Sequence, residues 1–129
     1  VRSSGIYGPG RNYMLGQINR GIGYPADPIR YSNRIHRDDC VGVLEHLYQR
    51  SQQQTLAPIY LASDDEPVAL HEVSDWLAEQ LGVEITDSSA QRTIGSKRCS
   101  NKQLKEVGYL FKYPSFKLGY PPLISQFKG

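Results

Sequence analysis

The sequence predicts a small mixed α/β lobe, because short strand patterns alternate with helical patterns along its 129 residues. Residues 1–7 read as a strand that stops abruptly at residues 8–10, Gly-Pro-Gly, where the two glycines and the proline favour a rigid loop. Residues 29–35 alternate as a strand does. Residues 70–81 repeat apolar side chains on one helical face.

Composition and charge exclude several classes of protein. The length suits one domain with a useful core. Fifteen basic residues against thirteen acidic ones are too balanced to predict a nucleic-acid partner. No apolar run reaches membrane-spanning length, so no membrane partner is expected. Cys40 and Cys99 lack metal-ligand spacing, so we expect reduced thiols, a cytoplasmic location and no metal.

The loop after the first strand is the first candidate site. Ligands of open α/β sheets bind just outside the carboxyl ends of strands. Tyr7 and Arg11 flank residues 8–10 and offer a hydroxyl and a guanidinium, which suit a hydroxylated, phosphorylated ligand. An ordinary turn with an incidental arginine fits the pattern equally well.

Residues 12–31 read as a long loop with a brief helical turn, and a substrate lid and a disordered segment are both open interpretations. In the strand that follows, Ile29, Tyr31, Asn33 and Ile35 would share one face. Asp38 or Asp39 is expected to cap a helix that runs to about Arg50. The predicted apolar stripe of that helix consists of Cys40, Val43, Leu44 and Leu47.

The second half of the sequence predicts a short buried strand over 59–62. The helix with the clearest sequence pattern follows over 70–81, with Ala69 as its N-cap candidate and Gly82 after its end. Residues 83–86 are a strand candidate, and 87–96 a loop. Residues 100–103, Ser-Asn-Lys-Gln, have the spacing of a capping box ahead of a short helix. A final helical turn is expected over 115–118, and the tail with Pro121 and Pro122 is expected to wrap the surface.

Three segments carry a family resemblance. They are residues 2–11 (Arg-Ser-Ser-Gly-Ile-Tyr-Gly-Pro-Gly-Arg), 33–39 (Asn-Arg-Ile-His-Arg-Asp-Asp) and 96–102 (Ser-Lys-Arg-Cys-Ser-Asn-Lys). In these the chain resembles the NAD(P)-dependent epimerases/dehydratases of nucleoside-diphosphate sugars, within the extended short-chain dehydrogenases/reductases. A glycine-rich dinucleotide fingerprint and a Tyr-x-x-x-Lys pair do not occur in the sequence. The chain therefore looks like the carboxyl-terminal part of a Rossmann-type enzyme, and its start at Val1 suggests truncation.

The resemblance implies roles for particular residues. Tyr7, Gly8 and Pro9 would border NAD or NADP in the parent protein, although the isolated chain is expected to bind none. The nucleotide-sugar substrate would be bound by a set of polar residues: Tyr7, Arg11, Asn33, Arg34, His36, Lys97 and Arg98. Arginine forks suit a pyrophosphate, whereas ordinary solvated charge is the alternative for each basic cluster. We expect His36 to bind or to support structure, and no catalytic residue lies in this chain.

The leading functional hypothesis is therefore the substrate-binding lobe of an epimerase or dehydratase. It would span residues 1–129, with residues 1–11 as the end of a Rossmann-sheet strand and its loop, and would lack the amino-terminal NAD(P)-binding domain. Arg37 stands where many relatives carry an apolar residue, which puts the common sugar pocket in doubt. A non-catalytic NAD(P)-sensing protein on the same scaffold is the alternative. Because a truncated sheet exposes a strand edge, we also expect self-association, as a homo-oligomer or through that edge.

Overall fold

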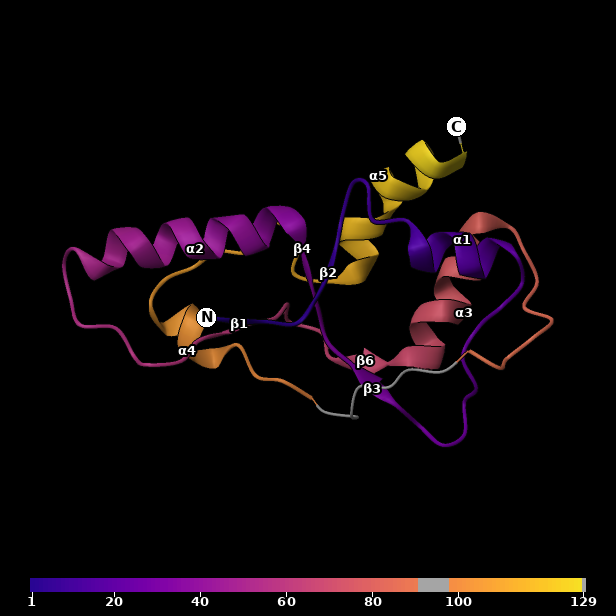
Figure 1. Ribbon diagram of the computed structural model, residues 1–129, viewed down its shortest axis with the longest axis horizontal. Helices are drawn as coiled ribbons and strands as arrows, with labels where there is room; N and C mark the ends of the chain where they lie inside the picture. Colours follow the sequence, from indigo (N-terminus) through magenta and orange to yellow (C-terminus); the bar gives the residue numbers. More distant parts are fainter. Residues whose placement is uncertain (91–97, 129) are drawn as a thin grey trace.

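The computed structural model describes residues 1–90 and 98–128. Within these ranges eleven short elements alternate along the chain (Figure 1). In order they are β1 (Arg2–Ser3), β2 (Gly5–Tyr7), α1 (Tyr13–Asn19), β3 (Tyr31–Ser32), β4 (Arg34–His36), α2 (Arg37–Ser51), β5 (Leu61–Ala62), β6 (Val68–Ala69), α3 (Leu70–Leu81), α4 (Lys102–Glu106) and α5 (Phe116–Lys128). The predicted mixed fold is confirmed.

The strands form three pairs. β1 pairs with β5 and β2 with β4, both in parallel, whereas β3 pairs with β6 in antiparallel orientation. The single strand expected over 29–35 was wrong, because Asn33 separates β3 from β4 and each half follows a different partner. The expected division into faces fails with it: Ile29 is exposed, while Ser32 and Arg34 are buried.

Helix α2 begins at Arg37, two residues earlier than an Asp38 cap would place it, and its cap is different. His36 is the N-cap, and its Nδ1 accepts the backbone N–H of Asp38 at 3.0 Å, so the expected aspartate caps were wrong. Val43 and Leu47 of the expected stripe are buried, but Leu44 is 53% exposed. The error arose because apolar residues lie on more than one face of this helix.

Helix α3 confirms its prediction. Leu70, Val73, Leu77 and Leu81 are buried on one face, and Ala69 is the N-cap, without a side-chain hydrogen bond. Gly82 ends the helix in the left-handed region, with φ of +71°, where a glycine has no steric penalty.

Two expectations in the second half were wrong. Residues 83–86 are not a strand, and only an isolated bridge, Ile22 to Asp87, forms beside them. Ser100 does accept the backbone N–H of Lys102, but the N-cap of α4 is Asn101. The side-chain amide of Asn101 instead donates to Ser63 and Asp65, so tertiary contacts replace the predicted capping box.

Helix α5 is the largest departure, because it runs through Pro121 and Pro122 to Lys128 instead of ending at Leu118. Ser115 does accept the backbone N–H of Lys117, as expected of a cap. A proline inside a helix leaves the carbonyl four residues before it without a donor. The two affected carbonyls belong to Lys117 and Leu118, which are exposed to solvent, while Tyr120, Leu123 and Ile124 bury the inner face. Burial of this face outweighs the proline penalty.

Two clusters of buried side chains hold these elements. The first, which we call the α3 core, joins α1, α3 and α5 through side chains that include Ile18, Leu77, Phe116 and Leu123. The second, the α2 core, joins α2, α4 and the β4 and β5 strands through Ile35, Val43, Leu47, Ala62 and Leu104. In Figure 1 the two sets of helices lie on opposite sides of β2 and β4. No helix among the described residues is long and apolar enough to cross a membrane.

Candidate functional site

The carboxyl ends of β2 and β4 lie side by side. Tyr7 ends β2, His36 ends β4, and the two residues are paired in the parallel register. Their rings meet edge to face, with centroids 5.2 Å apart. Since ligands of α/β folds bind beyond such strand ends, this edge and the loop over residues 8–11 form the candidate site.

The loop is fixed by close backbone contacts. A Cβ on Gly8, whose φ is +153°, would lie 2.9 Å from the Cβ of Arg37, so only glycine fits there. The backbone N–H of Arg11 donates to the Gly8 carbonyl at 3.0 Å, and the Arg37 guanidinium reaches the Pro9 carbonyl at 3.4 Å. Arg11 itself is exposed. The loop thus carries the exposed Arg11, and the guanidinium of Arg37, at the start of α2, lies beside the loop and pairs with Asp38 at 3.4 Å.

His36 caps α2 at this edge and is 3% exposed. Its Nδ1 accepts the Asp38 N–H, so the neutral ring carries its proton on Nε2. Burial lowers the pKa of His36 and Arg37 acts in the same direction, while Asp38 and Asp39 oppose them. The ring also stacks on Tyr113, with centroids 4.0 Å apart. A neutral imidazole held in this way can donate one hydrogen bond from Nε2.

Tyr7 and Arg34 face into the protein. Tyr7 is 5% exposed and stacks on Tyr120, with centroids 4.6 Å apart. Arg34 is also buried, donates to the Glu66 carbonyl and to Ser32, and lies with its guanidinium 5.3 Å from the centroid of the Phe116 ring. Both side chains pack in the interior next to the strand ends, and neither presents its polar group at the surface.

Asp64 completes a buried polar cluster with these two residues, and sequence reasoning missed it. One carboxyl oxygen accepts the Glu66 N–H at 3.0 Å, while Asp64 Oδ2 and the Tyr7 hydroxyl have no hydrogen-bond partner among the described residues. Burial raises the pKa of Asp64 to about 7, against the Glu66 hydrogen bond and the Arg34 charge. Burial, followed by the Asp64 charge, also raises the pKa of Tyr7. The position of Asp64 just after the β5 strand was the sequence signal that could have identified it as a site residue.

Asp39 is a second buried carboxyl that the sequence reading misassigned. It is fully buried and accepts the Tyr109 hydroxyl at 2.6 Å and the backbone N–H groups of Lys112 and Tyr113 at 2.8 Å each. It therefore anchors residues 109–113 beside His36. Its role is not helix capping.

The remaining predicted site residues lie elsewhere. Asn33 accepts the backbone N–H of Cys99 at 2.8 Å, and the Arg98 guanidinium lies 4.6 Å from the centroid of the Tyr31 ring, so both belong to the β3 side. Lys97 is outside the described residues. Tyr7, Arg34 and His36 are thus brought together beneath the loop that carries Arg11, whereas the contacts of Asn33 and Arg98 tie them to another segment.

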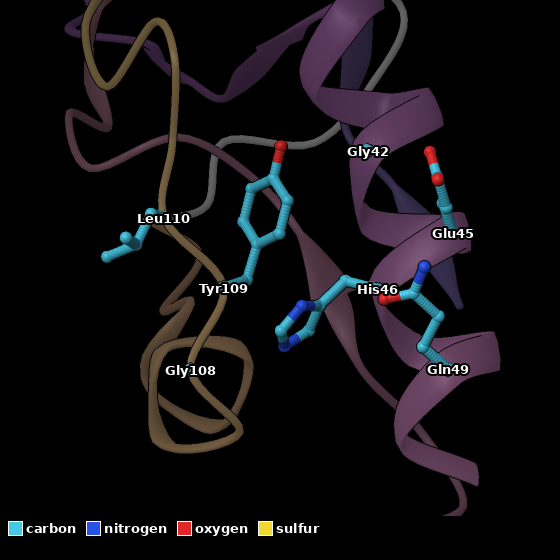
Figure 2. Close-up of a pocket in the computed structure, with 7 residues that line it drawn as sticks. All are labelled: Gly42, Glu45, His46, Gln49, Gly108, Tyr109 and Leu110. Carbon is cyan, nitrogen blue, oxygen red and sulfur yellow. The ribbon is translucent and has the colours of Figure 1, made fainter. Parts of the chain in front are cut away.

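A groove of about 290 Å³ opens on the other side of α2, and no sequence signal pointed to it. Figure 2 shows the Tyr109 ring and the His46 imidazole between α2 and residues 108–110. His46 Nε2 lies 2.8 Å from the Val107 carbonyl, and a Cβ on Gly42 would lie 2.6 Å from the Tyr109 hydroxyl. These contacts are packing contacts, and the described lining residues include none of the predicted site residues.

The loop leaves little room beside its first glycine. The Cβ of Arg37 fills the space next to Gly8, and Tyr7 is 5% exposed. No group of three or more potential metal ligands occurs among the residues that the structure describes.

Parallel strands ending in a Gly-Pro loop, with helices packed on either side, define a part of a Rossmann-type α/β protein. No family model and no curated protein sequence matches the chain. Among solved structures, a protein provisionally assigned as an NAD-dependent epimerase/dehydratase from Methylobacillus flagellatus matches with a TM-score of 0.79 and 30% identity, over 98% of this chain and 46% of that one. The solved structures that the chain matches are thus NAD-dependent epimerase/dehydratases and related short-chain dehydrogenases/reductases, and the chain corresponds to a carboxyl-terminal portion of them.

Two further structures agree on the fold. A conserved protein of unknown function from Silicibacter pomeroyi matches with a TM-score of 0.76 and 29% identity, over 99% of this chain and 48% of that one. The human epimerase family protein SDR39U1, solved with NADPH, matches with a TM-score of 0.74 and 18% identity, over 96% of this chain and 47% of that one. The chain thus spans about half the length of the structures it matches.

Proposed function

We propose that this chain is the substrate-binding lobe of an NAD(P)-dependent epimerase or dehydratase that acts on a nucleoside-diphosphate sugar. The observation that carries the proposal is the pairing of Tyr7 with His36 at adjacent strand ends, in a chain with 30% identity to a protein provisionally assigned as an NAD-dependent epimerase/dehydratase. The adjacent loop carries the exposed Arg11, and Arg37, at the start of α2, has a half-exposed guanidinium that reaches this loop at the Pro9 carbonyl and also pairs with Asp38.

In this proposal the lobe orients the substrate and leaves the chemistry to the rest of the protein. Guanidinium groups bind pyrophosphate oxygens through paired, charge-assisted hydrogen bonds. The neutral His36 ring would donate from Nε2 to a ligand oxygen at the strand ends. NAD(P), bound elsewhere in the protein, would exchange the hydride with the sugar. By holding the sugar in place, the lobe would lower the entropic part of the barrier to that hydride transfer.

The test is ligand binding by the full-length protein, saturated with NADH or NADPH. Calorimetric titration with UDP-glucose and dTDP-glucose compares the wild type with Arg11→Ala and Arg37→Ala. We expect each substitution to raise the Kd about tenfold, as loss of a charge-assisted hydrogen bond does. Arg50→Ala, which removes an equal charge from the far end of α2, is the matched control.

Two results would contradict the proposal. Equal affinity of the Arg11, Arg37 and Arg50 variants for both nucleotide sugars would remove the loop from the binding site. NAD(P)-dependent turnover by the isolated 129-residue chain would contradict the division of labour between this lobe and the rest of the protein.

A further inference from the structure

A second groove, of about 360 Å³, lies apart from the strand ends, on the outer side of α3 beside the first turn of α5. The described residues that line it include none of those predicted to bind substrate or cofactor. Its volume lies within the range of ligand-binding pockets, at the small end.

Carboxylates dominate the rim of this groove. Glu72, Asp75 and Glu79 are spaced by three and four residues, so they share one exposed face of α3. Glu66 adds a fourth acid from the segment before β6, and Lys117 is the single lysine or arginine among the described lining residues. The whole chain carries a net charge of +2, so the sign of this patch is opposite to that of the molecule. Such a patch attracts cations.

The floor of the groove is aromatic. Trp76 is half-buried and meets Phe116 edge to face, with centroids 5.4 Å apart and an interplanar angle of 89°. Phe116 is 1% exposed and forms the base on which Trp76 rests. Among aromatic side chains, tryptophan binds a cation over its face most strongly. The groove therefore combines an apolar surface with negative charge around it.

One polar atom in the groove lacks a partner. His71 Nδ1 is buried and has no hydrogen-bond partner within the described part of the chain. In the neutral tautomer with the proton on Nε2, this nitrogen is a buried acceptor without a donor, which destabilises the protein until a donor reaches it. The acids and the histidine here do not form a set of described residues that could hold a metal ion. A ligand that combines an N–H donor with a positive charge would suit both the unpartnered His71 nitrogen and the acidic rim.

We propose that this groove binds an arginine-containing basic segment of a partner protein. One guanidinium stacks on Trp76 and donates both to the α3 carboxylates and to His71 Nδ1. A guanidinium fits better than an ammonium because it is planar, stacks on aromatic faces and donates in a fork. The acidic face from Glu72 to Glu79 is about 10 Å long at the rise of a helix, longer than one guanidinium, so the segment carries more than one basic residue. This proposal does not depend on the proposed enzymatic function.

The experiment uses the fluorescence of Trp76, which is the only tryptophan of the chain. The probe is an acetylated, amidated peptide of alternating glycine and arginine, and its matched control replaces each arginine with citrulline, the neutral isostere. At low ionic strength we expect a saturable change in Trp76 emission, with the arginine peptide binding about tenfold more tightly than the citrulline peptide. Added salt should weaken binding of the arginine peptide, because the carboxylates are exposed.

Two double variants test the site. Glu72→Gln with Asp75→Asn should weaken binding of the arginine peptide about fivefold to tenfold, whereas Glu45→Gln with Glu106→Gln, which removes the same charge from exposed positions elsewhere, should leave it unchanged. Circular dichroism establishes that both variants fold. Equal binding of the arginine and citrulline peptides, equal losses in the two double variants, or tighter binding of spermidine than of the peptide would each overturn the proposal.

Discussion

The α3 core and the α2 core differ in how completely their main helices are covered. Helix α3 buries its apolar stripe, and its outer face is acidic. Helix α2 buries Val43 and Leu47, yet Val41, Leu44 and Tyr48 on its other side are 60%, 53% and 70% exposed. One helix is amphipathic in the ordinary sense, and the other carries apolar side chains on two faces.

The difference teaches why one helix was predicted correctly and the other only in part. A single apolar stripe identifies both a helix and the face that it buries. Two apolar faces identify the helix but leave its buried face open, which is why Leu44 was misassigned. An apolar face of this kind often marks a contact surface. The exposed side chains Val41, Leu44 and Tyr48 belong to neither of the two cores. The self-association expected from the sequence stays a prediction.

The largest effect should come from closing the contact between α5 and β2. A Cβ on Gly119 would lie 2.0 Å from the Tyr7 hydroxyl and 2.7 Å from its ring carbons. Gly119→Ala should therefore destabilise the α3 core by about 3 kcal/mol, because neither the ring nor the helix can move freely. Chemical denaturation measures the loss. Gly16→Ala in α1, where the nearest atom is 4.0 Å from the new Cβ, is the control and should change little.

The α2 core has its own sensitive position, at Asp39. Asp39→Asn should cost about 2–3 kcal/mol, because an amide cannot accept all three hydrogen bonds from residues 109–113 and turns a donor toward one of them. Asp38→Asn removes the same charge from a side chain that is 42% exposed and should cost far less. If the two substitutions shift the denaturation midpoint equally, Asp39 is not the anchor of this core.

These contacts also show where sequence reasoning stopped. The motif residues Tyr7 and His36 were singled out because both sit in short, recognisable segments, and the fold pairs them. Asp39 was assigned to helix capping because the start of the helix is close to it in the sequence. The three donors that it accepts are about 70 residues away, and no local pattern reveals them.

In the carboxyl-terminal helix, too, contacts distant in the sequence decide the structure, here against the local preference. Pro121 and Pro122 locally favour a helix end, yet the buried Tyr120 stacks on Tyr7 and extends the helix. Tertiary packing overrides local preference here. The enclosed Asp64 was hidden for the same reason, since its burial depends on side chains from several elements.

Asp64 makes the strand-end cluster sensitive to pH. Its pKa is raised to about 7 in the folded protein from an ordinary value of 3.8, so the folded state holds a proton that the unfolded state releases. Stability should therefore fall as pH rises from about 4 to about 7, by roughly 3 kcal/mol. Asp64→Asn should flatten this slope and be more stable than the wild type at pH 8. Denaturation curves at pH 5 and pH 8 measure both effects, and parallel slopes would exclude Asp64 as the cause.

The smallest effect concerns the start of α3, the best-formed helix of its core. Ala69 is the N-cap and supplies no side-chain hydrogen bond, so the first N–H groups of the helix lack a side-chain acceptor there. Ala69→Ser should raise the free energy of unfolding by roughly 0.5–1 kcal/mol, because its hydroxyl accepts an N–H two or three residues on. Ala69→Val adds bulk without an acceptor and should not stabilise. A serine variant that gains no more than the valine variant would mean that β6, which pairs Ala69 with Tyr31, holds the backbone out of capping geometry.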